Sequence, residues 1–252
     1  MRNWASYKSQ IVTTLIGAAI GIASWGLLGT YNTASVPEYN TNYVSFLVSG
    51  IIITSMVIPI STGISSRLAP ASLETILMTG INSPTYVLGS LGWTYIMSMV
   101  LVIPQLALAL VLFPIALRID PLTLVVAFAI SSVIMFSLSM IAAGMRLVTK
   151  VTDPVSWFLA AAPTLLAGMT FPIQHLNSVL PGLSDVSWFI PQTWVYDTMR
   201  IGLLTGGSVA DPSFALHFLG AAVVALVLLP LGIHAFNWGL RRAKQQGTIG
   251  WY

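Results

Sequence analysis

The sequence predicts an all-α membrane protein with six transmembrane helices, a short cytoplasmic helix between spans two and three, and outer re-entrant helices between spans five and six. Three observations lead to this fold class. The chain of 252 residues is 56% hydrophobic and only 7% charged, whereas soluble domains carry roughly 25% charged residues. Its mean hydropathy is +0.86. Its apolar residues gather into runs of about 20, the length that crosses a hydrocarbon core about 30 Å thick.

Six apolar runs divide the chain, which we interpret as a single domain over residues 1–252. The third run is longer than a membrane needs, so we expect it to project beyond the bilayer or to bend at Pro104 or Pro114. The fifth run is short and contains Pro163. The predicted spans are residues 11–30, 43–65, 86–117, 122–145, 155–171 and 214–238.

The charges between the spans predict the orientation. With six spans, both termini lie on one side, and the connections of that side hold eight basic and two acidic residues, a net charge of +6. The other connections hold two basic and five acidic residues, a net charge of −3. Because positively charged connections are retained in the cytoplasm, we expect a multi-pass protein of the cell membrane with both termini cytoplasmic.

The N-terminal 35 residues also fit a cleavable signal peptide, because Arg2 and Lys8 precede an apolar run and small residues follow it. The run is longer than the usual signal core of about 7 to 15 residues. We therefore interpret it as the first membrane helix, with residues 2–10 as a short interfacial lead-in.

Small residues at helical spacing predict close helix packing at two places. Gly17 and Gly21 are four residues apart in the first span, and residues 142–144 of the fourth span read Ala-Ala-Gly. Such residues let helix backbones approach one another in a membrane.

The chemistry of an enzyme is missing from the sequence. The chain has no cysteine, its three histidines are scattered, and the predicted spans contain almost no ionisable residue, although membrane enzymes and ion-driven carriers keep such residues for function. Motifs for zinc proteases, serine hydrolases and nucleotide-binding phosphate loops are also absent. We therefore expect no catalytic residue, no bound metal, no cofactor and no nucleic-acid partner, and any energy for transport must come from another subunit.

The first informative connection, residues 67–90, lies on the predicted cytoplasmic side and contains a short helical pattern. Ser72 is a capping residue, and Glu74 brings the charge that the first turn of a helix favours. Residues 82–84, Asn-Ser-Pro, end the pattern. An apolar stripe lies at helical spacing, formed by Leu73, Ile76, Leu77 and Gly80. Such a helix either closes a hairpin on the membrane surface or offers its stripe to a protein partner.

The second informative connection, residues 171–200, lies on the predicted outer side. It has enough apolar residues to enter the membrane without the length to cross it, and backbone at that depth requires protein or a water-filled cavity around it. We predict two short helices, one over 175–180 and one over 192–204. Asp197 and Arg200 are spaced three residues apart, which predicts a local ion pair. The segment is either an aromatic belt that anchors a loop or a lid over a translocation path.

With these two segments in place, the chain resembles the ABC type-2 transporter permeases, the membrane subunits of exporters for drugs, antibiotics, glycolipids and polysaccharides. Residues 73–79, Leu-Glu-Thr-Ile-Leu-Met-Thr, followed by Ser83-Pro84, are similar to the cytoplasmic segment of the family. Phe171-Pro172 and the stretch from Phe189 to Arg200 are similar to its outer segment. Ile190-Pro191 stands where Asn-Pro is more usual, and residues 80–82 replace an immediate Thr-Pro.

The resemblance implies a half-transporter that pairs with a second permease subunit, identical or not, in the lipid bilayer. Each permease would dock on an ATPase subunit, two copies in all, which bind ATP and Mg²⁺. The implied ATPase-coupling residues are Ser72, Leu73, Glu74, Ile76, Leu77, Met78, Thr79, Gly80, Ser83 and Pro84. The implied outer gate comprises Phe171, Pro172, Leu176, Trp188, Phe189, Pro191, Trp194, Tyr196, Asp197 and Arg200.

Other functions remain open at the level of sequence. A non-transporting membrane scaffold or sensor could share the architecture, and the empty spans disfavour a membrane-bound enzyme. The scarcity of charge in the spans favours a hydrophobic or amphipathic cargo, although an aromatic lining also suits a polysaccharide or glycolipid.

Overall fold

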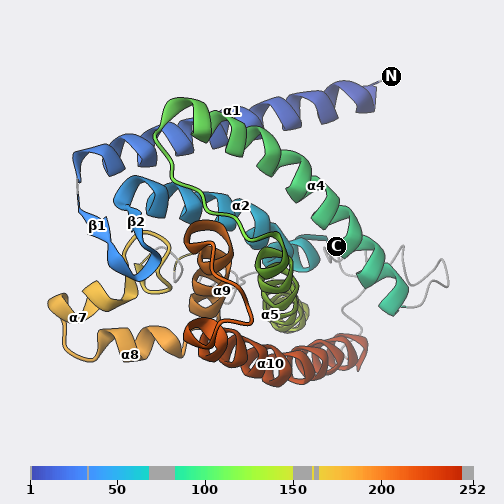
Figure 1. Cartoon of the computed structure of the whole chain (residues 1–252). Helices are drawn as coiled ribbons and strands as arrows, with labels where there is room; N and C mark the ends of the chain where they lie inside the picture. The colour runs from blue at the N-terminus through green and yellow to red at the C-terminus, as the bar shows by residue number, and fades with distance from the viewer. Residues whose placement is uncertain (1, 33, 68–82, 150–160, 162–164, 246–252) are drawn as a thin grey trace.

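The computed structural model describes residues 2–32, 34–67, 83–149, 161 and 165–245. This part of the chain is all-α apart from one short β-hairpin (Figure 1). The prediction of an all-α protein is therefore confirmed. The long helices lie against one another, and the short helices α7 (Leu176–Val179), α8 (Leu183–Trp188) and α9 (Pro191–Arg200) gather beside the hairpin and the first turns of α2 (Tyr43–Arg67) (Figure 1).

The first two long helices form an antiparallel pair joined by the hairpin. Helix α1 spans Arg2–Tyr31 without a break, so the expected lead-in at residues 2–10 is part of the same helix. Strands β1 (Ser35–Val36) and β2 (Thr41–Asn42) pair antiparallel around the 3₁₀ turn η1 (Pro37–Tyr39). Helix α2, Tyr43–Arg67, follows at once because the side chain of Asn42 accepts a hydrogen bond from the Ser45 amide and caps the first turn.

The predicted third span is shorter as a helix than expected. Helix α4 spans Ser83–Leu112 and contains Pro104, and residues 114–120 then form an irregular link. A proline disfavours helical geometry in the residue before it and has no amide hydrogen to donate, so the helix ends just ahead of Pro114. The predicted end at residue 117 is thus wrong, and Pro104 lies inside the helix.

Helix α5, Pro121–Thr149, agrees with the predicted fourth span. It begins where its sequence dictates, because the Asp120 carboxylate accepts a hydrogen bond from the Thr123 amide and Pro121 occupies the first helical position. Of the predicted fifth span, only residues 161 and 165–171 are described. Residues 166–171 form turns instead of helix, with Gly168 at a φ of +81°, so the predicted helical end at residue 171 is wrong.

Three short helices follow, one more than expected. The turn η2 (Ile173–His175) leads into α7 (Leu176–Val179), which matches the predicted helix over 175–180. Helix α8 (Leu183–Trp188) was not predicted. Helix α9 (Pro191–Arg200) continues into one π-helical turn, η3 (Ile201–Thr205), and together they match the prediction over 192–204.

The last helix, α10, spans Pro212–Gln245 and extends the predicted sixth span at both ends. The Asp211 carboxylate accepts hydrogen bonds from the amide and the hydroxyl of Ser213. These bonds lower the pKa of Asp211, because they stabilise its ionised form. Helix α10 thus begins with the same Asp-Pro arrangement as α5.

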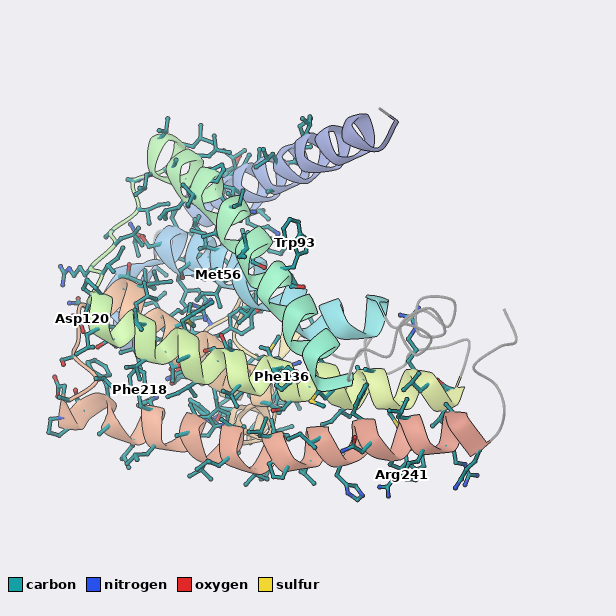
Figure 2. The ribbon with its side chains drawn as sticks, turned by 90° about the vertical axis from the view of Figure 1, so that its right-hand side faces the viewer. Met56, Trp93, Asp120, Phe136, Phe218 and Arg241 are labelled. Carbon is teal, nitrogen blue, oxygen red and sulfur yellow. The ribbon has the colours of Figure 1, made fainter. Side chains whose placement is uncertain are left out.

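Helices α5 and α10 lie side by side and run in the same direction (Figure 2). Asp120 and Phe218 lie near one end of the pair, and Arg241 lies near the other (Figure 2). We call the end where both helices begin the acidic end, because Asp120 and Asp211 precede them. The opposite end, with Arg146, Arg241 and Arg242 in the last turns, is called the basic end.

Glycines make the close contact between α5 and α10 possible. A Cβ atom added to Gly144 would lie 2.4 Å from the carbonyl oxygen of Ala235, and one added to Gly239 would lie 2.2 Å from the carbonyl oxygen of Gly144. The packing predicted for residues 142–144 is therefore confirmed. At Gly17 and Gly21, added Cβ atoms would meet nothing within 4 Å among the described residues of this chain, so the close packing predicted there is not found within the chain.

Two of the described helices are long and apolar enough to cross a membrane, namely Pro121–Thr149 and the Pro212–Ala243 portion of α10. In the most apolar window of α10, only 17% of the residues are buried within the chain. A core helix of a soluble protein is mostly buried, so the exposure of α10 favours the membrane interpretation. Shorter apolar stretches lie in α1, α2 and α4, at Leu15–Tyr31, Tyr43–Val57 and Val102–Leu112.

Candidate functional site

The predicted gate residues converge on helix α9, whose local sequence fixes its ends. Ile190 is extended, as expected before a proline, and Pro191 occupies the first helical position. The helix passes into η3, which ends at Gly206 with a φ of +66°. Backbone bonds from the amides of Arg118 and Asp120 to the carbonyls of Leu203 and Gly202 hold η3 against the start of α5.

Arg200, at the end of α9, is the largest fully buried side chain among the described residues, at 1% exposure. Its guanidinium donates to the carbonyl oxygens of Gly168 at 2.5 Å and Met169 at 2.7 Å. Weaker bonds reach the carbonyl of Phe46 at 3.3 Å and the hydroxyl of Ser49 at 3.4 Å, both on α2. Arg200 therefore joins three segments that are distant in sequence: α9, α2 and the turn at residues 168–169.

Aromatic rings enclose the same guanidinium. Its central carbon lies 3.7 Å from the ring centroid of Phe46, and 5.8 Å and 5.7 Å from those of Tyr39 and Tyr196. Burial lowers the pKa of Arg200 because it disfavours the charged form, but an arginine side chain stays protonated in proteins. The carbonyls and the ring faces together compensate a buried positive charge.

Asp197 lies one turn before Arg200 and is also buried, at 4% exposure. It accepts a hydrogen bond from the Tyr39 hydroxyl at 2.8 Å and lies 2.5 Å from Nδ1 of His217 on α10. Burial and the Asp197 charge raise the pKa of Tyr39, so its phenol stays protonated as the donor. The predicted ion pair between Asp197 and Arg200 is wrong: each side chain turns to partners on other elements instead.

We call this group the Arg200 cluster and define it as Tyr39, Phe46, Ser49, Asp197, Arg200 and His217, with the carbonyls of residues 168 and 169. Tyr196 adds a further tie to α2 through its hydroxyl, which lies 2.8 Å from that of Thr54. The cluster thus connects α9 to three other elements, namely the hairpin, α2 and α10.

Beside the cluster lies a pocket of about 140 Å³, open to the surface and lined by Trp188, Trp194, Leu216 and His217. The two indole rings have centroids 4.7 Å apart and are tilted by 57°. Trp194 is fixed because its Nε1 donates to the carbonyl of Trp188, and because its ring packs on Gly220 of α10. We call this group the aromatic pocket.

The remaining gate residues separate into a buried and an exposed set. Pro172 and Leu176 are buried, and Pro191 is partly buried, so they anchor the short helices. Phe171 and Phe189 are 50% and 87% exposed. Within this chain the structure therefore brings Tyr196, Asp197 and Arg200 together with Trp188 and Trp194 nearby, and leaves the two phenylalanines on the surface.

The predicted ATPase-coupling residues from 72 to 80 lie outside the described residues. Ser83 and Pro84 are described as the first two residues of α4. Of the two predicted sites, the structure describes the geometry of the gate region.

Several members of the Arg200 cluster were missed by sequence reasoning. Tyr39, Phe46 and Ser49 lie about 150 residues from Asp197 and Arg200 in the sequence, and no local pattern links them. His217 is one of the three scattered histidines, and no role was predicted for it from the sequence. One clue was available, since a histidine inside an apolar run is costly unless it has a partner.

The comparisons with known proteins give no family. No family model matches the chain, and no curated protein matches it.

Proposed function

We propose that this chain is the transmembrane permease subunit of an ATP-binding-cassette exporter. In this proposal it sits in the cell membrane with six spans and two cytoplasmic termini, forms the substrate path with a second permease subunit, and is driven by two separate ATPase subunits that bind ATP and Mg²⁺. The chain itself is not an enzyme. Its cargo is hydrophobic or amphipathic.

The parallel course of α5 and α10 is the observation that carries the proposal. Asp120 lies near one end of this pair and Arg241 near the other (Figure 2). Asp211 directly precedes α10, and the last turns of the two helices contain Arg146 and Arg242. A basic end held in the cytoplasm follows the positive-inside rule. The acidic end, with the Arg200 cluster, then lies at the outer surface.

Two parallel spans require a return crossing between them. If α5 and α10 both run from outside to inside, the chain must cross back between residues 149 and 212. The predicted fifth span, residues 155–171, lies in this interval, but its last six residues are not helical, so helix for the crossing can come only from residues before 166. This requirement supports the fifth predicted span and an even total number of spans.

The position of α9 supports a re-entrant gate. Thr54, which contacts Tyr196, lies eleven residues after the start of α2 at Tyr43, or about 16 Å along the helix axis. In the proposed membrane setting, helix α9 therefore extends along α2 to about this depth in the bilayer, but it does not cross the bilayer. Backbone at such depth is tolerated only inside protein or beside a water-filled cavity, and the buried partners of Arg200 and Asp197 satisfy the former condition.

The proposal assigns the energy source to another chain. The sequence has no phosphate-binding loop. A separate ATPase subunit would therefore bind the cytoplasmic segment at residues 72–84, which contains Glu74 and the apolar stripe. ATP-driven movement of that segment would tilt α2 and α4, which flank it. Because the Arg200 cluster ties α2 to α9, the movement would reach the outer gate.

Co-purification with a phosphate-loop ATPase encoded beside this chain tests the proposal. The variant Glu74→Ala with Leu77→Asp is expected to lose ATPase binding, because it removes one charged contact and places a carboxylate in the apolar stripe. A loss of tenfold or more in co-purified ATPase is expected, since an unpaired buried charge costs several kcal/mol. Turnover of the reconstituted complex should fall with it.

A matched variant on the opposite surface is the control. Asp185→Ala with Leu180→Asp makes the same chemical changes at exposed positions near the acidic end and should leave ATPase binding intact. Equal binding by both variants would rule out the coupling assignment. If the wild-type chain fails to bind any such ATPase, the non-transporting scaffold becomes the better interpretation.

A further inference from the structure

A row of three hydrogen-bonded side chains connects the hairpin, α9 and α10. The Tyr39 hydroxyl donates to Oδ1 of Asp197, and Nδ1 of His217 lies 2.5 Å from Oδ2 of the same carboxyl group. The Asp197 side chain is 5% exposed, whereas that of His217 is 37% exposed. The row thus begins inside the chain and ends at a titratable ring that water can reach.

The bond to Asp197 determines which nitrogen of His217 responds to pH. An ionised carboxylate can only accept, so Nδ1 carries a hydrogen in both the neutral and the charged form of the ring. The proton that is gained or lost therefore belongs to the other ring nitrogen, and histidine is the side chain that titrates between about pH 5 and 8. The contact persists through this titration, but it is an ion pair only when the ring is charged.

The charges of α9 and the hairpin make Asp197 the partner of His217. Arg200 has the same sign as a protonated ring, but its guanidinium is bound by the carbonyl oxygens of residues 168 and 169. On the hairpin, Tyr39 donates to Asp197, and Glu38 adds a negative charge beside it. The group that contacts the ring directly is the Asp197 carboxylate.

The other elements near His217 offer no comparable partner. Helix α8 presents the Trp188 ring, whose centroid lies 6.1 Å from that of the imidazole, and its one charged residue, Asp185, is exposed. Asp120, just before α5, already accepts a hydrogen bond from the Thr123 amide. Protonation of His217 therefore acts mainly on the contact between α10 and α9.

This contact responds to pH, whereas its apolar neighbour does not. The packing of the Trp194 ring on Gly220 also joins α9 to α10, and it involves no titratable group. Charge on both partners strengthens the bond between His217 and Asp197 and adds a Coulomb attraction at short distance. The attachment of α9 to α10 is therefore strongest at low pH, and it weakens as the pH rises and the ring loses its proton.

We propose that the His217–Asp197 pair is a pH-dependent switch that sets how strongly α9 is attached to α10. Its role rests on the proposed function, in which α9 belongs to the outer gate. His217 lies five residues after the start of α10 at Pro212, on the side that the proposed topology places outside. A gate that opens by separation of α9 from α10 would then open less readily at low external pH.

Hydrogen–deuterium exchange of the full chain in detergent tests the switch. At about pH 5.5 and about pH 8, on either side of the histidine titration, the exchange rate of the α9 amides is divided by that of the α5 amides in the same sample. The chemical effect of pH on exchange cancels in this ratio. In the wild type the ratio is expected to rise roughly fivefold from the lower to the higher pH, because the contact loses its charged donor. An unchanged or falling ratio would overturn the proposal.

Three variants assign the effect to the pair. His217→Gln can still donate from its amide to Asp197 but has no charge, so it should abolish the rise. Asp197→Asn removes the other charge at nearly the same shape and should abolish the rise as well. His234→Gln, at an exposed position further along α10, should keep it. A rise of the wild-type size in His217→Gln or in Asp197→Asn would refute the pair, and the wild-type ratio remains a test if a substitution prevents folding.

The exchange experiment is independent of ATPase coupling. It contains no ATPase and no transport step, so a failure of ATPase docking would leave the exchange ratio unchanged. A failure of the switch would in turn leave ATPase binding unchanged.

Discussion

Replacing Arg200 with alanine is expected to destabilise the protein by about 3 kcal/mol or more, a fall in Tm of roughly 10 °C. The side chain is 1% exposed and donates to the carbonyls of Gly168 and Met169. Its removal leaves those carbonyls without a donor and opens a space beside the Phe46 ring. The thermal unfolding of the purified protein in detergent measures the effect.

Two further variants make this prediction specific. Arg200→Lys should recover less than half of the loss, because an ammonium group cannot form the two parallel bonds of the guanidinium or stack on the Phe46 ring. Arg118→Ala, at an exposed arginine of the same end, should change the stability by less than about 0.5 kcal/mol. A fall for Arg200→Ala as small as that for Arg118→Ala would contradict the cluster.

Replacing Gly144 with alanine is expected to lower the stability by about 1 to 3 kcal/mol, although alanine is the better helix former. The new Cβ atom would lie 2.4 Å from the Ala235 carbonyl oxygen and 3.0 Å from the Cα atom of Phe236. Both are backbone atoms, so α5 and α10 must move apart to admit the methyl group. Thermal unfolding again measures the change, and Gly239→Ala should behave in the same way.

Gly21→Ala provides the control of opposite sign. An added Cβ atom there meets nothing within 4 Å, so the variant should be neutral or more stable, because alanine in a helix interior is favoured over glycine by up to about 1 kcal/mol. If Gly144→Ala and Gly21→Ala changed the Tm in the same direction, the close packing of α5 on α10 would be refuted.

The helices of this chain could be predicted where local chemistry determines them. Asp120-Pro121 and Asp211-Pro212 mark the starts of α5 and α10 because a carboxylate cap and an initial proline suit the same geometry. Pro191 begins α9 for the same reason. The predicted helix ends at residues 117 and 171 were wrong because they were taken from hydropathy. Pro114 and Gly168 interrupt the helix through their backbone geometry, which a hydropathy pattern does not show.

The gate region was predicted as a segment but not as a site. The sequence predicted an ion pair between Asp197 and Arg200 because they are three residues apart. In the structure both side chains are buried, and each forms hydrogen bonds with residues of other elements. Tyr39 and Phe46 precede them by about 150 residues. A single sequence gives spacing along one helix, whereas the Arg200 cluster depends on tertiary contacts among the hairpin, α2, α9 and α10.

The proposed topology places the acidic and basic ends on opposite sides of a membrane. The chain contains no cysteine, so single cysteines can be introduced without background. Asp185→Cys and Ser208→Cys mark the acidic end, and Arg242→Cys marks the basic end. A membrane-impermeant maleimide, applied to intact cells, should label the first two, and it should label the third only after permeabilisation. Labelling of Arg242→Cys in intact cells, or of all three variants from the same side, would contradict the account.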